Sequence, residues 1–366
     1  MKRRQILTGL GAGAATVALS ACGSKTECAE ATASNTKTIH WNMVTTWPKN
    51  FQGLGEGAEY LANLIGKMSS GRLKIRIFGA GELVPALQVF DTVSAGNAQM
   101  GHGAAYYWRG KVPAASFFGA VPFGMNAQEM NSWLLKGDGL KLWEELYQPF
   151  GLIPRPCGNT GVQMAGWFNK ELNTLEDIKG LKMRIPGLGG EVLKRAGGVP
   201  VLLPGSEVFS SLERGALDAA EWVGPYNDLA FGLYKAAKYY YYPGWHEPGS
   251  TMEAIINQKA LAELPEDLQQ IVLNACLIAN VDMLAEFTAR NQQALIVLQQ
   301  QHNVQLRKIP DEILKELKVI SVEVIKESIA GDVMGQRVYD SYHKFLEQVK
   351  PWTALSEQSY LAARDL

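Results

Sequence analysis

The chain has 366 residues and a mass of 40.1 kDa, with 47% hydrophobic residues and a formal net charge of -1 from 35 basic and 36 acidic side chains. A chain of this size buries a large core and can divide into two lobes. Because the charges are balanced and spread along the chain, nucleic acid and an anionic membrane surface are poor electrostatic partners. Four cysteines without a CxxC spacing argue against a zinc finger, a covalent haem and a disulfide framework.

The first 21 residues have the pattern of an export signal. Lys2-Arg3-Arg4 forms a positive start, and the weakly apolar stretch from Ile6 to Leu19 is too short and too rich in glycine to span a bilayer as a helix. The adjacent arginines resemble a twin-arginine signal, which exports folded proteins. We therefore expect the mature protein to work outside the cytoplasm, in the periplasm.

The residues that end this signal, Leu19-Ser20-Ala21-Cys22, resemble the cleavage box of a bacterial lipoprotein. In that interpretation Cys22 carries a lipid, and the small, polar residues 22–37 form a flexible tether to a membrane. The alternative is an ordinary secretory signal in which Cys22 is incidental. No apolar run beyond residue 21 is long enough for a second membrane span.

Strand and helix patterns alternate from Thr38 onward. This alternation predicts an α/β fold with a largely parallel sheet flanked by helices. Strands are predicted at 39–44, 73–77, 162–168, 181–185, 199–203, 219–223 and 251–257. Helices are predicted at 54–68, around Leu87 to Val93, at 191–196, and at 207–214 with Ser206 as its cap.

From Pro265 to His302 the apolar residues follow one helical stripe. A helix of about 37 residues is about 55 Å long, which exceeds the width of one lobe, so it bridges two lobes or reaches a second subunit. The helical tail from Asp311 to Lys350 suits a subunit interface, which leaves a homodimer open.

Arg184 lies at the end of a short apolar strand, immediately before Pro186-Gly187. In open α/β sheets, this end of a strand faces the ligand crevice. A guanidinium group is planar and permanently charged, so it can hold a carboxylate through two parallel hydrogen bonds. Taken alone, a surface arginine at a strand end remains the alternative.

Two carboxylates stand in apolar, inflexible surroundings: Glu221 before Trp222, and Glu247 in the turn-rich segment after four tyrosines. Charges in such places are costly unless they are paired or bound to a metal. Two carboxylates with amide and main-chain oxygens suit calcium or sodium. His246 offers an acid–base alternative, although neighbouring residues on an extended chain point in opposite directions.

Tyr106 and Tyr107 stand in a run of aromatic residues just before Gly110. They suit either the wall of a pocket or ordinary packing beneath a loop. The run of four tyrosines at 239–242 equally suits a buried strand.

Five segments follow one another in a recognisable order and spacing: TTWPKN, GAGELVPALQVFDTVSAG, GLKMRIPG, LPGSEVFSSLERGALDAAEWVGPYND and YYYYPGWHEPG. Together they resemble the extracytoplasmic solute receptors of tripartite ATP-independent periplasmic (TRAP) transporters. The branch they resemble binds 2-oxo acids and 2-hydroxy acids. The similarity covers roughly residues 38 to 350.

The resemblance implies a two-lobed periplasmic binding protein fold, with a cleft between the lobes, strands that cross between them and a long bridging helix over 265–302. Lobe 1 would contain residues 38–157 and part of 225–257. Lobe 2 would contain residues 158–224 and part of 250–310. Residues 311–366 would form a C-terminal helical tail.

The resemblance also implies roles for single residues. Arg184 would anchor the carboxylate of the ligand. A metal ion would bridge protein and ligand, held by the side chains of Gln163, Glu221 and Glu247 and the main-chain carbonyl of Trp222. Tyr106, Tyr107 and Asn159 would contact the ligand, and Trp222 would lie beside it. His246 departs from the family pattern, in which another aromatic residue is usual.

These expectations combine into a receptor that is not an enzyme. It would bind a small 2-oxo or 2-hydroxy monocarboxylate, such as pyruvate or lactate, with calcium or sodium, and deliver it to TRAP membrane subunits. Charge balance favours calcium. The alternative from another class is an exported metal-dependent enzyme acting on small organic acids through Glu221, His246 and Glu247. A receptor for an ATP-driven importer is a third interpretation.

Overall fold

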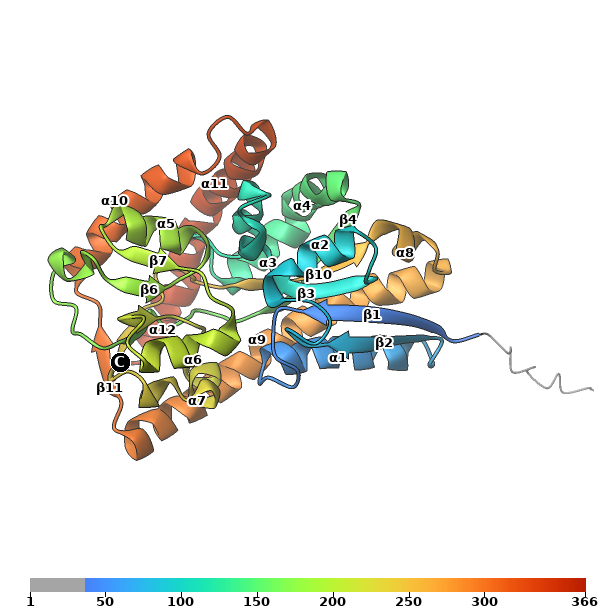
Figure 1. The fold of residues 1–366 in the computed structure, drawn as a ribbon. Helices are drawn as coiled ribbons and strands as arrows, with labels where there is room; N and C mark the ends of the chain where they lie inside the picture. The colour runs from blue at the N-terminus through green and yellow to red at the C-terminus, as the bar shows by residue number, and fades with distance from the viewer. Residues whose placement is uncertain (1–36) are drawn as a thin grey trace, which may run out of the picture. The chain divides into compact units, whose positions relative to one another are not determined.

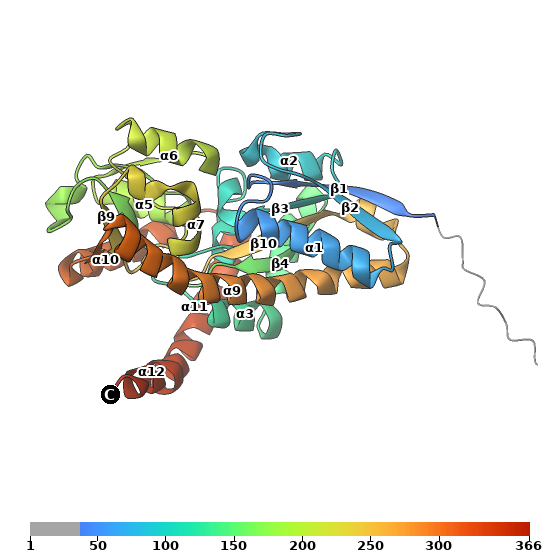
Figure 2. The same ribbon diagram turned by 90° about the horizontal axis from the view of Figure 1, so that it is seen from below.

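The computed structural model describes residues 37–366, and residues 38–366 form one compact unit (Figure 1). The predicted export signal, Cys22 and the tether up to residue 36 lie outside the described residues. The compact unit contains two β-sheets with helices packed on them, and one long helix passes along both sheets (Figure 2). The structure thus has the predicted two-lobed α/β architecture.

The first sheet contains five strands: β1 (Ile39–Thr45), β2 (Leu73–Phe78), β3 (Met100–Ala104), β4 (Leu152–Asn159) and β10 (Thr251–Asn257). Their order is β2-β1-β3-β10-β4. β1 is parallel to β2 and β3, whereas β10 is antiparallel to β3 and β4. β10 has this direction because the chain returns through it from the second sheet.

The second sheet contains six short strands: β5 (Gly166–Phe168), β6 (Lys182–Arg184), β7 (Val199–Val201), β8 (Ala219–Ala220), β9 (Tyr239–Tyr242) and β11 (Gln305–Lys308). Their order is β11-β9-β5-β8-β6-β7. β5 is antiparallel to both of its neighbours, and the other pairs are parallel. In each sheet a single strand, β10 in the first and β5 in the second, runs opposite to all the others, so the prediction of a largely parallel sheet flanked by helices is confirmed.

Four predicted strands are shorter than expected, and those predicted over 181–185 and 199–203 are observed as Lys182–Arg184 and Val199–Val201. The strand predicted over 162–168 begins only at Gly166, and the one predicted over 219–223 ends at Ala220. Gly166 has φ +121°, and a β-carbon there would lie 2.7 Å from the main-chain oxygen of Ala220, so the strands approach each other closely at this glycine. The residues beside these strands leave the sheet to form the candidate site.

Most predicted helices are present, with shifted ends. Ser206 is not a helix cap, because the helix begins one residue earlier and Pro204 precedes its first turn. The helices of the first lobe are α1 (Leu54–Met68), α2 (Val89–Ser94), α3 (Ala127–Lys136), α4 (Gly139–Tyr147) and α8 (Gln258–Ala262), with 3₁₀ turns η1 (Ala86–Gln88), η2 (Ala105–Trp108), η3 (Pro113–Phe118) and η4 (Gln148–Phe150). Those of the second are α5 (Gly187–Arg195), α6 (Gly205–Glu213) and α7 (Pro225–Phe231), with η5 (Leu175–Ile178) and η6 (Leu233–Lys235).

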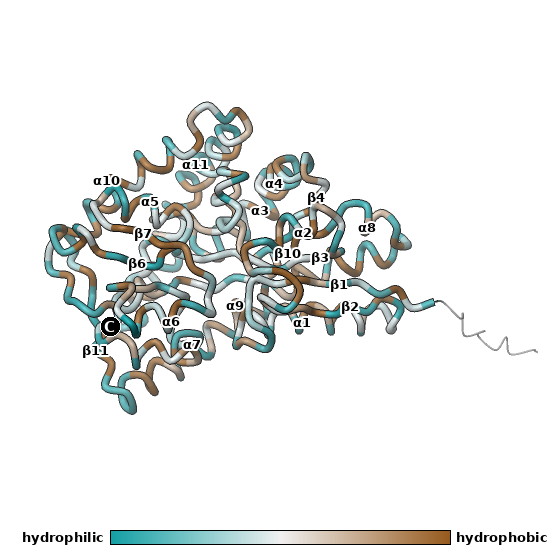
Figure 3. Tube along the Cα trace, in the orientation of Figure 1, coloured by the Kyte–Doolittle hydropathy of each residue, from teal (hydrophilic) through white to brown (hydrophobic). Residues whose placement is uncertain are grey.

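The long helix α9 (Glu266–His302) is present as predicted. Its first half packs in the core of the first sheet through residues such as Val272 and Cys276, and its second half reaches the core of the second sheet through Phe287 and Leu298. An 18-residue window of α9 has a mean hydropathy of 1.5, which by length and composition suits a membrane span. Hydrophilic and hydrophobic positions nevertheless alternate along it (Figure 3). Its buried face belongs to the two cores, so α9 is the bridging helix of this fold.

The chain ends in α10 (Asp311–Glu327), α11 (Val333–Thr353), one π-helical turn η7 (Ala354–Gln358) and α12 (Ser359–Arg364). α10 packs on α5, and the first part of α11 packs on η3, α3 and α4. The end of α11 and α12 extend away from the two sheets (Figure 2).

Two segments cross between the sheets side by side. Residues 160–165 connect β4 to β5, and residues 243–250 connect β9 to β10. Main-chain hydrogen bonds join them: the N–H of Gln163 donates to the carbonyl of Glu247 at 3.2 Å, and the N–H of Gly244 donates to the carbonyl of Gln163 at 2.9 Å. These bonds fix the position of one crossing segment relative to the other.

Two acidic side chains lie inside the cores. Glu253 on β10 accepts hydrogen bonds from the Trp108 indole and, at 3.0 Å, from the Tyr147 hydroxyl. Asp228 on α7 accepts hydrogen bonds from the Trp167 indole at 2.9 Å and the Tyr240 hydroxyl at 2.7 Å. Burial disfavours the charged form and raises the pKa of each carboxyl to about 7.

We predict that Gly244→Ala destabilises the protein. A β-carbon at residue 244 would lie 2.2 Å from the main-chain oxygen of Gln163, so the two crossing segments must move apart. We expect a loss of about 2 kcal/mol in the free energy of unfolding, measured in urea. Gly110→Ala is the control, because nothing lies within 4 Å of that position. Equal stability of the two variants would contradict the close approach.

We also predict that stability falls as pH rises from about 4 to about 7. In the unfolded chain, the carboxyls of Glu253 and Asp228 ionise near their ordinary pKa values of 4.5 and 3.8, whereas in the folded chain they resist ionisation up to about 7. Proton release therefore favours the unfolded state over this interval. Glu253→Gln should flatten the dependence of the melting temperature on pH, and Glu263→Gln on the exposed surface should not. Identical profiles for both variants would refute this origin.

Candidate functional site

Arg184 and Glu221 stand at the ends of two neighbouring strands, β6 and β8. These strands are parallel, and Arg184 lies opposite Ala220 in the ladder. An ion pair joins the guanidinium of Arg184 to the carboxylate of Glu221, and each side chain is only 1% exposed. Arg184 Nη1 also donates to the main-chain oxygen of Glu221 at 3.0 Å. The strand register therefore brings together the two charges predicted from the sequence.

The guanidinium of Arg184 is enclosed by aromatic rings. Its Nη2 donates to the hydroxyl of Tyr107 at 3.3 Å, and its central carbon lies 4.9 Å from the ring centre of Trp222. Burial alone lowers the pKa of Arg184, but the charge of Glu221 raises it above its ordinary value. Arg184 is therefore a fixed positive charge in a dry environment.

Glu247 lies on the second crossing segment and is buried. Its Oε2 accepts hydrogen bonds from Gln163 Nε2 at 2.8 Å, from the hydroxyl of Ser250, and from the hydroxyl of Tyr106 at 3.4 Å. Burial, followed by the negative charge of Glu221, raises the pKa of Glu247 to about 7. A cation between the two glutamates would favour the ionised form of both.

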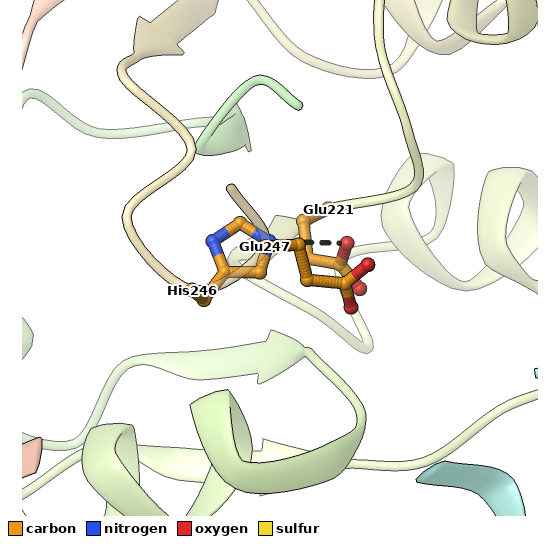
Figure 4. Close-up of side chains that lie close together, drawn as sticks. All are labelled: Glu221, His246 and Glu247. Atoms are coloured by element: carbon orange, nitrogen blue, oxygen red, sulfur yellow. Dashed lines mark hydrogen bonds and ion pairs between the residues drawn. The ribbon is translucent and has the colours of Figure 1, made fainter. Parts of the chain in front are cut away.

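Glu221, His246 and Glu247 converge, and each offers a ligand atom within 4.8 Å of the others (Figure 4). His246 Nε2 lies 3.3 Å from Glu221 Oε2. The expectation that His246 and Glu247 point in opposite directions is wrong, because the chain turns here instead of staying extended. The turn is closed by hydrogen bonds from the N–H of Trp245 to Pro243 and from the N–H of Glu247 to Gly244.

The first sheet supplies an aromatic wall opposite these charges. Tyr106 and Tyr107 follow β3, and Trp47 follows β1, so all three stand at the carboxyl ends of parallel strands. The ring of Trp47 lies 6.1 Å from that of Tyr107 and 6.3 Å from that of Trp222. The two tyrosines therefore lie at the charged cluster, with their hydroxyls on Glu247 and Arg184.

Asn159 lies beside this cluster, at the end of β4. Its amide donates to the Thr251 hydroxyl at 3.2 Å and its oxygen accepts from the Gly161 N–H at 2.9 Å. Both polar atoms are thus occupied within the chain. Ligand contact by Asn159 stays a prediction.

Three residues at or beside the site were not assigned a role from the sequence. Ser250 and Thr160 bind the side chains of Glu247 and Gln163, and small hydroxyl residues in a turn carry no signal that marks such contacts. Trp47 belongs to the recognised segment TTWPKN. Its place directly after a strand that pairs in parallel is a signal that would have found it.

The residues fit a metal ion. Gln163 Nε2 donates to Glu247 and Thr160, which leaves Gln163 Oε1 buried without a hydrogen-bond partner among the described residues. A buried acceptor without a donor is costly, and a cation bound to it would remove that cost. Gln163, Glu221 and Glu247 would then supply hard oxygen ligands, while the main-chain carbonyl of Trp222 as a fourth ligand stays a prediction.

A separate cavity of about 490 Å³ lies between α5 and α10 and is lined by Arg109, Glu191, Arg195 and Glu327, among others. Both of its arginines are already compensated, since Arg109 pairs with Glu191 at 3.0 Å and Arg195 pairs with Glu327. The buried cluster around Arg184 is therefore the stronger candidate for a binding site.

Comparison with known proteins places the chain in a family. The model of the bacterial extracellular solute-binding proteins, family 7 (DctP), matches residues 43–332. A monocarboxylate 2-oxoacid-binding periplasmic protein of Nostoc sp. is 44% identical over 361 residues, which are 98% of each chain.

Solved structures share the fold. A TRAP periplasmic solute binding protein from Pseudoalteromonas atlantica, with bound sodium and pyruvate, is 43% identical with a TM-score of 0.86 over 89% of this chain and 99% of that one. One from Colwellia psychrerythraea, with bound calcium and pyruvate, is 42% identical with a TM-score of 0.87 over 89% and 100%. One from Bordetella bronchiseptica, a dimer with calcium and picolinate in an active site, is 35% identical with a TM-score of 0.87 over 90% and 100%.

These matches confirm the predicted fold and the resemblance to TRAP receptors, and they set aside the enzyme interpretation, because the family consists of solute-binding proteins. The chain belongs to family 7 of the bacterial extracellular solute-binding proteins.

Proposed function

We propose that this protein is the periplasmic receptor of a TRAP transporter and binds a small 2-oxo or 2-hydroxy monocarboxylate, such as pyruvate, together with a metal ion. The observation that carries this proposal is the burial of Arg184, Glu221, Glu247 and Gln163 in one cluster where the two crossing segments meet. The similar proteins that bind pyruvate or 2-oxoacids give the same ligand class.

The chemistry of the cluster selects this class of ligand. Arg184 would supply two parallel N–H donors to the ligand carboxylate. Its guanidinium would then contact both Glu221 and the ligand. A metal ion held by Gln163, Glu221 and Glu247 would supply a Lewis acid that chelates one carboxylate oxygen and the 2-oxo or 2-hydroxyl oxygen. A plain fatty acid lacks the second oxygen and would lose half of the chelate.

Charge balance favours a divalent ion. The two glutamates and the ligand carry three negative charges, and Arg184 carries one positive charge. A divalent cation makes the closed site neutral, whereas sodium leaves one buried negative charge, which is costly in a medium of low polarity. Calcium and sodium both occur with pyruvate in the similar structures, so a monovalent ion is tolerated by the fold.

The partner subunits and the anchor are part of this proposal. The lobes would close on the ligand, and the closed form would dock on the TRAP membrane subunits. The lipoprotein-like box ending in Cys22 would attach the receptor to a membrane. TRAP solute binding proteins among the similar structures support this transporter class over an ATP-driven importer.

We predict that Arg184→Ala lowers pyruvate affinity at least about 100-fold in calorimetry, because it removes a charge-assisted pair of hydrogen bonds from a buried carboxylate. The variant also leaves Glu221 without its partner, so folding is checked by thermal unfolding. Arg184→Lys, which keeps the charge but not the planar fork, should fold and still bind at least about 10-fold more weakly.

The control for this test is Arg195→Ala, since Arg195 is exposed on α5 and pairs with Glu327 at the surface. Its pyruvate affinity should equal that of the unchanged protein. Unchanged affinity in Arg184→Lys would refute the assigned role of the arginine.

We propose, further, that the C-terminal helices bind a second copy of the chain. Apolar side chains at the end of α11 and beyond are exposed: Trp352 is 67% exposed, Leu355 75% and Tyr360 65%. Exposed aromatic residues on a projecting element are typical of an interface. The Bordetella bronchiseptica protein forms a dimer.

We predict that the purified chain has the mass of a dimer in light scattering, and that Trp352→Ser combined with Leu355→Ser converts it to a monomer. Val281→Ser, at an exposed site on α9 that is 66% exposed, is the control and should leave the mass unchanged. A monomeric mass for the unchanged chain at micromolar concentration would contradict this assignment.

A further inference from the structure

Glu253 binds the turn that carries two site tyrosines, on the side that faces the core of the first lobe. Tyr106, Tyr107 and Trp108 are consecutive in η2. The two tyrosine hydroxyls contact Glu247 and Arg184, whereas the indole of Trp108 lies in the core of the first lobe, 5.7 Å from the ring of Phe90. There it donates to Glu253, whose other oxygen accepts from Tyr147 on α4 at 3.0 Å. Glu253 thus links this turn to β10 and α4.

A glycine on β3, Gly103, leaves space for the Trp108 indole beside Glu253. A β-carbon at Gly103, which faces Glu253 across the β3–β10 ladder, would lie 3.1 Å from Trp108 Cζ2. The indole therefore packs closely against β3, and its N–H donates to the carboxylate. Since Trp108 is adjacent to Tyr107, a shift of the indole moves the hydroxyl that contacts Arg184.

Asp228 is likewise a buried carboxylate that binds an indole and a phenol, and it lies beside the Glu221–Val223 loop on the other side of the site. Its Oδ2 accepts from Trp167 and Tyr240, whose rings are stacked 4.0 Å apart on β5 and β9. Its Oδ1 accepts from the main-chain N–H of Val223 at 3.3 Å. Val223 directly follows Glu221 and Trp222, so Asp228 holds the loop that carries these two residues.

The same loop is tied to the first crossing segment. The carbonyl of Val223 accepts from the N–H of Met164 at 3.0 Å, and Met164 follows Gln163. Asp228 therefore fixes Val223 from one side while Met164 binds it from the other. A displacement of Val223 changes the distance between the oxygens of Glu221 and Gln163, which are the oxygens of the candidate metal site.

We propose that Glu253 and Asp228 are positioning residues of the binding site: Glu253 orients the Tyr106–Tyr107 turn toward the ligand, and Asp228 orients the Glu221–Val223 loop toward the metal ion. The inference rests on the proposed function, because it assigns ligand and metal contacts to the two walls. Supporting residues that orient metal ligands typically contribute 10–100-fold to metal affinity.

Substitutions that differ in hydrogen bonding but not in volume distinguish a positioning role from a role in core packing. In Glu253→Gln, the amide oxygen still accepts from Trp108 and the amide nitrogen can donate to the Tyr147 oxygen, so the network survives. Glu253→Met has a similar volume but accepts no strong hydrogen bond. In Asp228→Asn, the oxygen keeps Trp167 and Tyr240, but the NH₂ group faces the N–H of Val223, so only the link to the loop is lost.

The test measures two affinities for each variant of the purified chain after removal of bound metal: calcium alone, and pyruvate at saturating calcium. Glu253→Met should lower pyruvate affinity at least about 10-fold, and Glu253→Gln should stay within about threefold. Asp228→Asn should lower calcium affinity about 10-fold while pyruvate affinity at saturating calcium stays within about threefold.

Val272→Ala on α9 is the matched control for lost stability, since Val272 is fully buried in the core of the first lobe and belongs to neither wall. It should lower the melting temperature and leave both affinities unchanged. If Glu253→Met and Asp228→Asn change affinity no more than Val272→Ala does, the positioning roles are wrong. If Glu253→Met does not fold, Trp108→Phe removes the indole N–H together with part of the buried ring, and a loss of pyruvate affinity larger than that of Val272→Ala gives the same decision.

The result also separates this inference from the proposed function. An unchanged protein that binds neither calcium nor pyruvate overturns the proposed function and the positioning roles with it. An unchanged protein that binds both, with variants that bind equally well, overturns only the positioning roles.

Discussion

Two glutamates buried side by side are the constraint on which the rest of the site depends. Glu221 and Glu247 are shielded from water and lie near each other, so their negative charges repel in surroundings of low polarity. Arg184 compensates one of them. Glu247 forms no ion pair with a described residue, and burial, followed by the negative charge of Glu221, raises its pKa. In the proposed function, a cation would supply the missing positive charge, and a small anion would then complete the balance.

The fold places these charges by using two different kinds of geometry. Arg184 and Glu221 stand at the ends of parallel strands, and the register of these strands fixes the position of one residue relative to the other. Gln163 and Glu247 stand on the crossing segments, which are irregular and are fixed by main-chain bonds to each other. A ligand bound to both sets of residues would therefore require one relative position of the sheet and the crossing segments. This dependence suits a receptor that closes on its ligand.

Much of this was predictable from the sequence because the signals were local. The apolar stripe from Leu268 to Phe287 predicted α9, and the strand end before Pro186 predicted the position of Arg184. The order of the five segments indicated the family, which the comparisons confirm, and with it a set of metal ligands, which stays a prediction. The ends of β5 and β8 were misjudged, because apolar residues continue past the points where the chain leaves the sheet.

Other features depended on contacts between distant parts of the chain. The approach of His246 to Glu221 requires the turn at Pro243 to Glu247, and extended-chain geometry gave the opposite direction. Likewise, Glu253 and Asp228 look like ordinary acidic residues in the sequence. Their indole and phenol partners, such as Tyr147 for Glu253 and Trp167 for Asp228, are 106 and 61 residues away.

The central claim is that a cation and a guanidinium act together on an acid with two adjacent oxygens. The most direct measurement titrates pyruvate and propionate, which differ at the second carbon, into metal-free protein with and without added calcium. The account predicts tight binding only for pyruvate and only with the metal. Equal affinities for the two acids, or pyruvate binding that is indifferent to calcium, sodium and chelator alike, would contradict it.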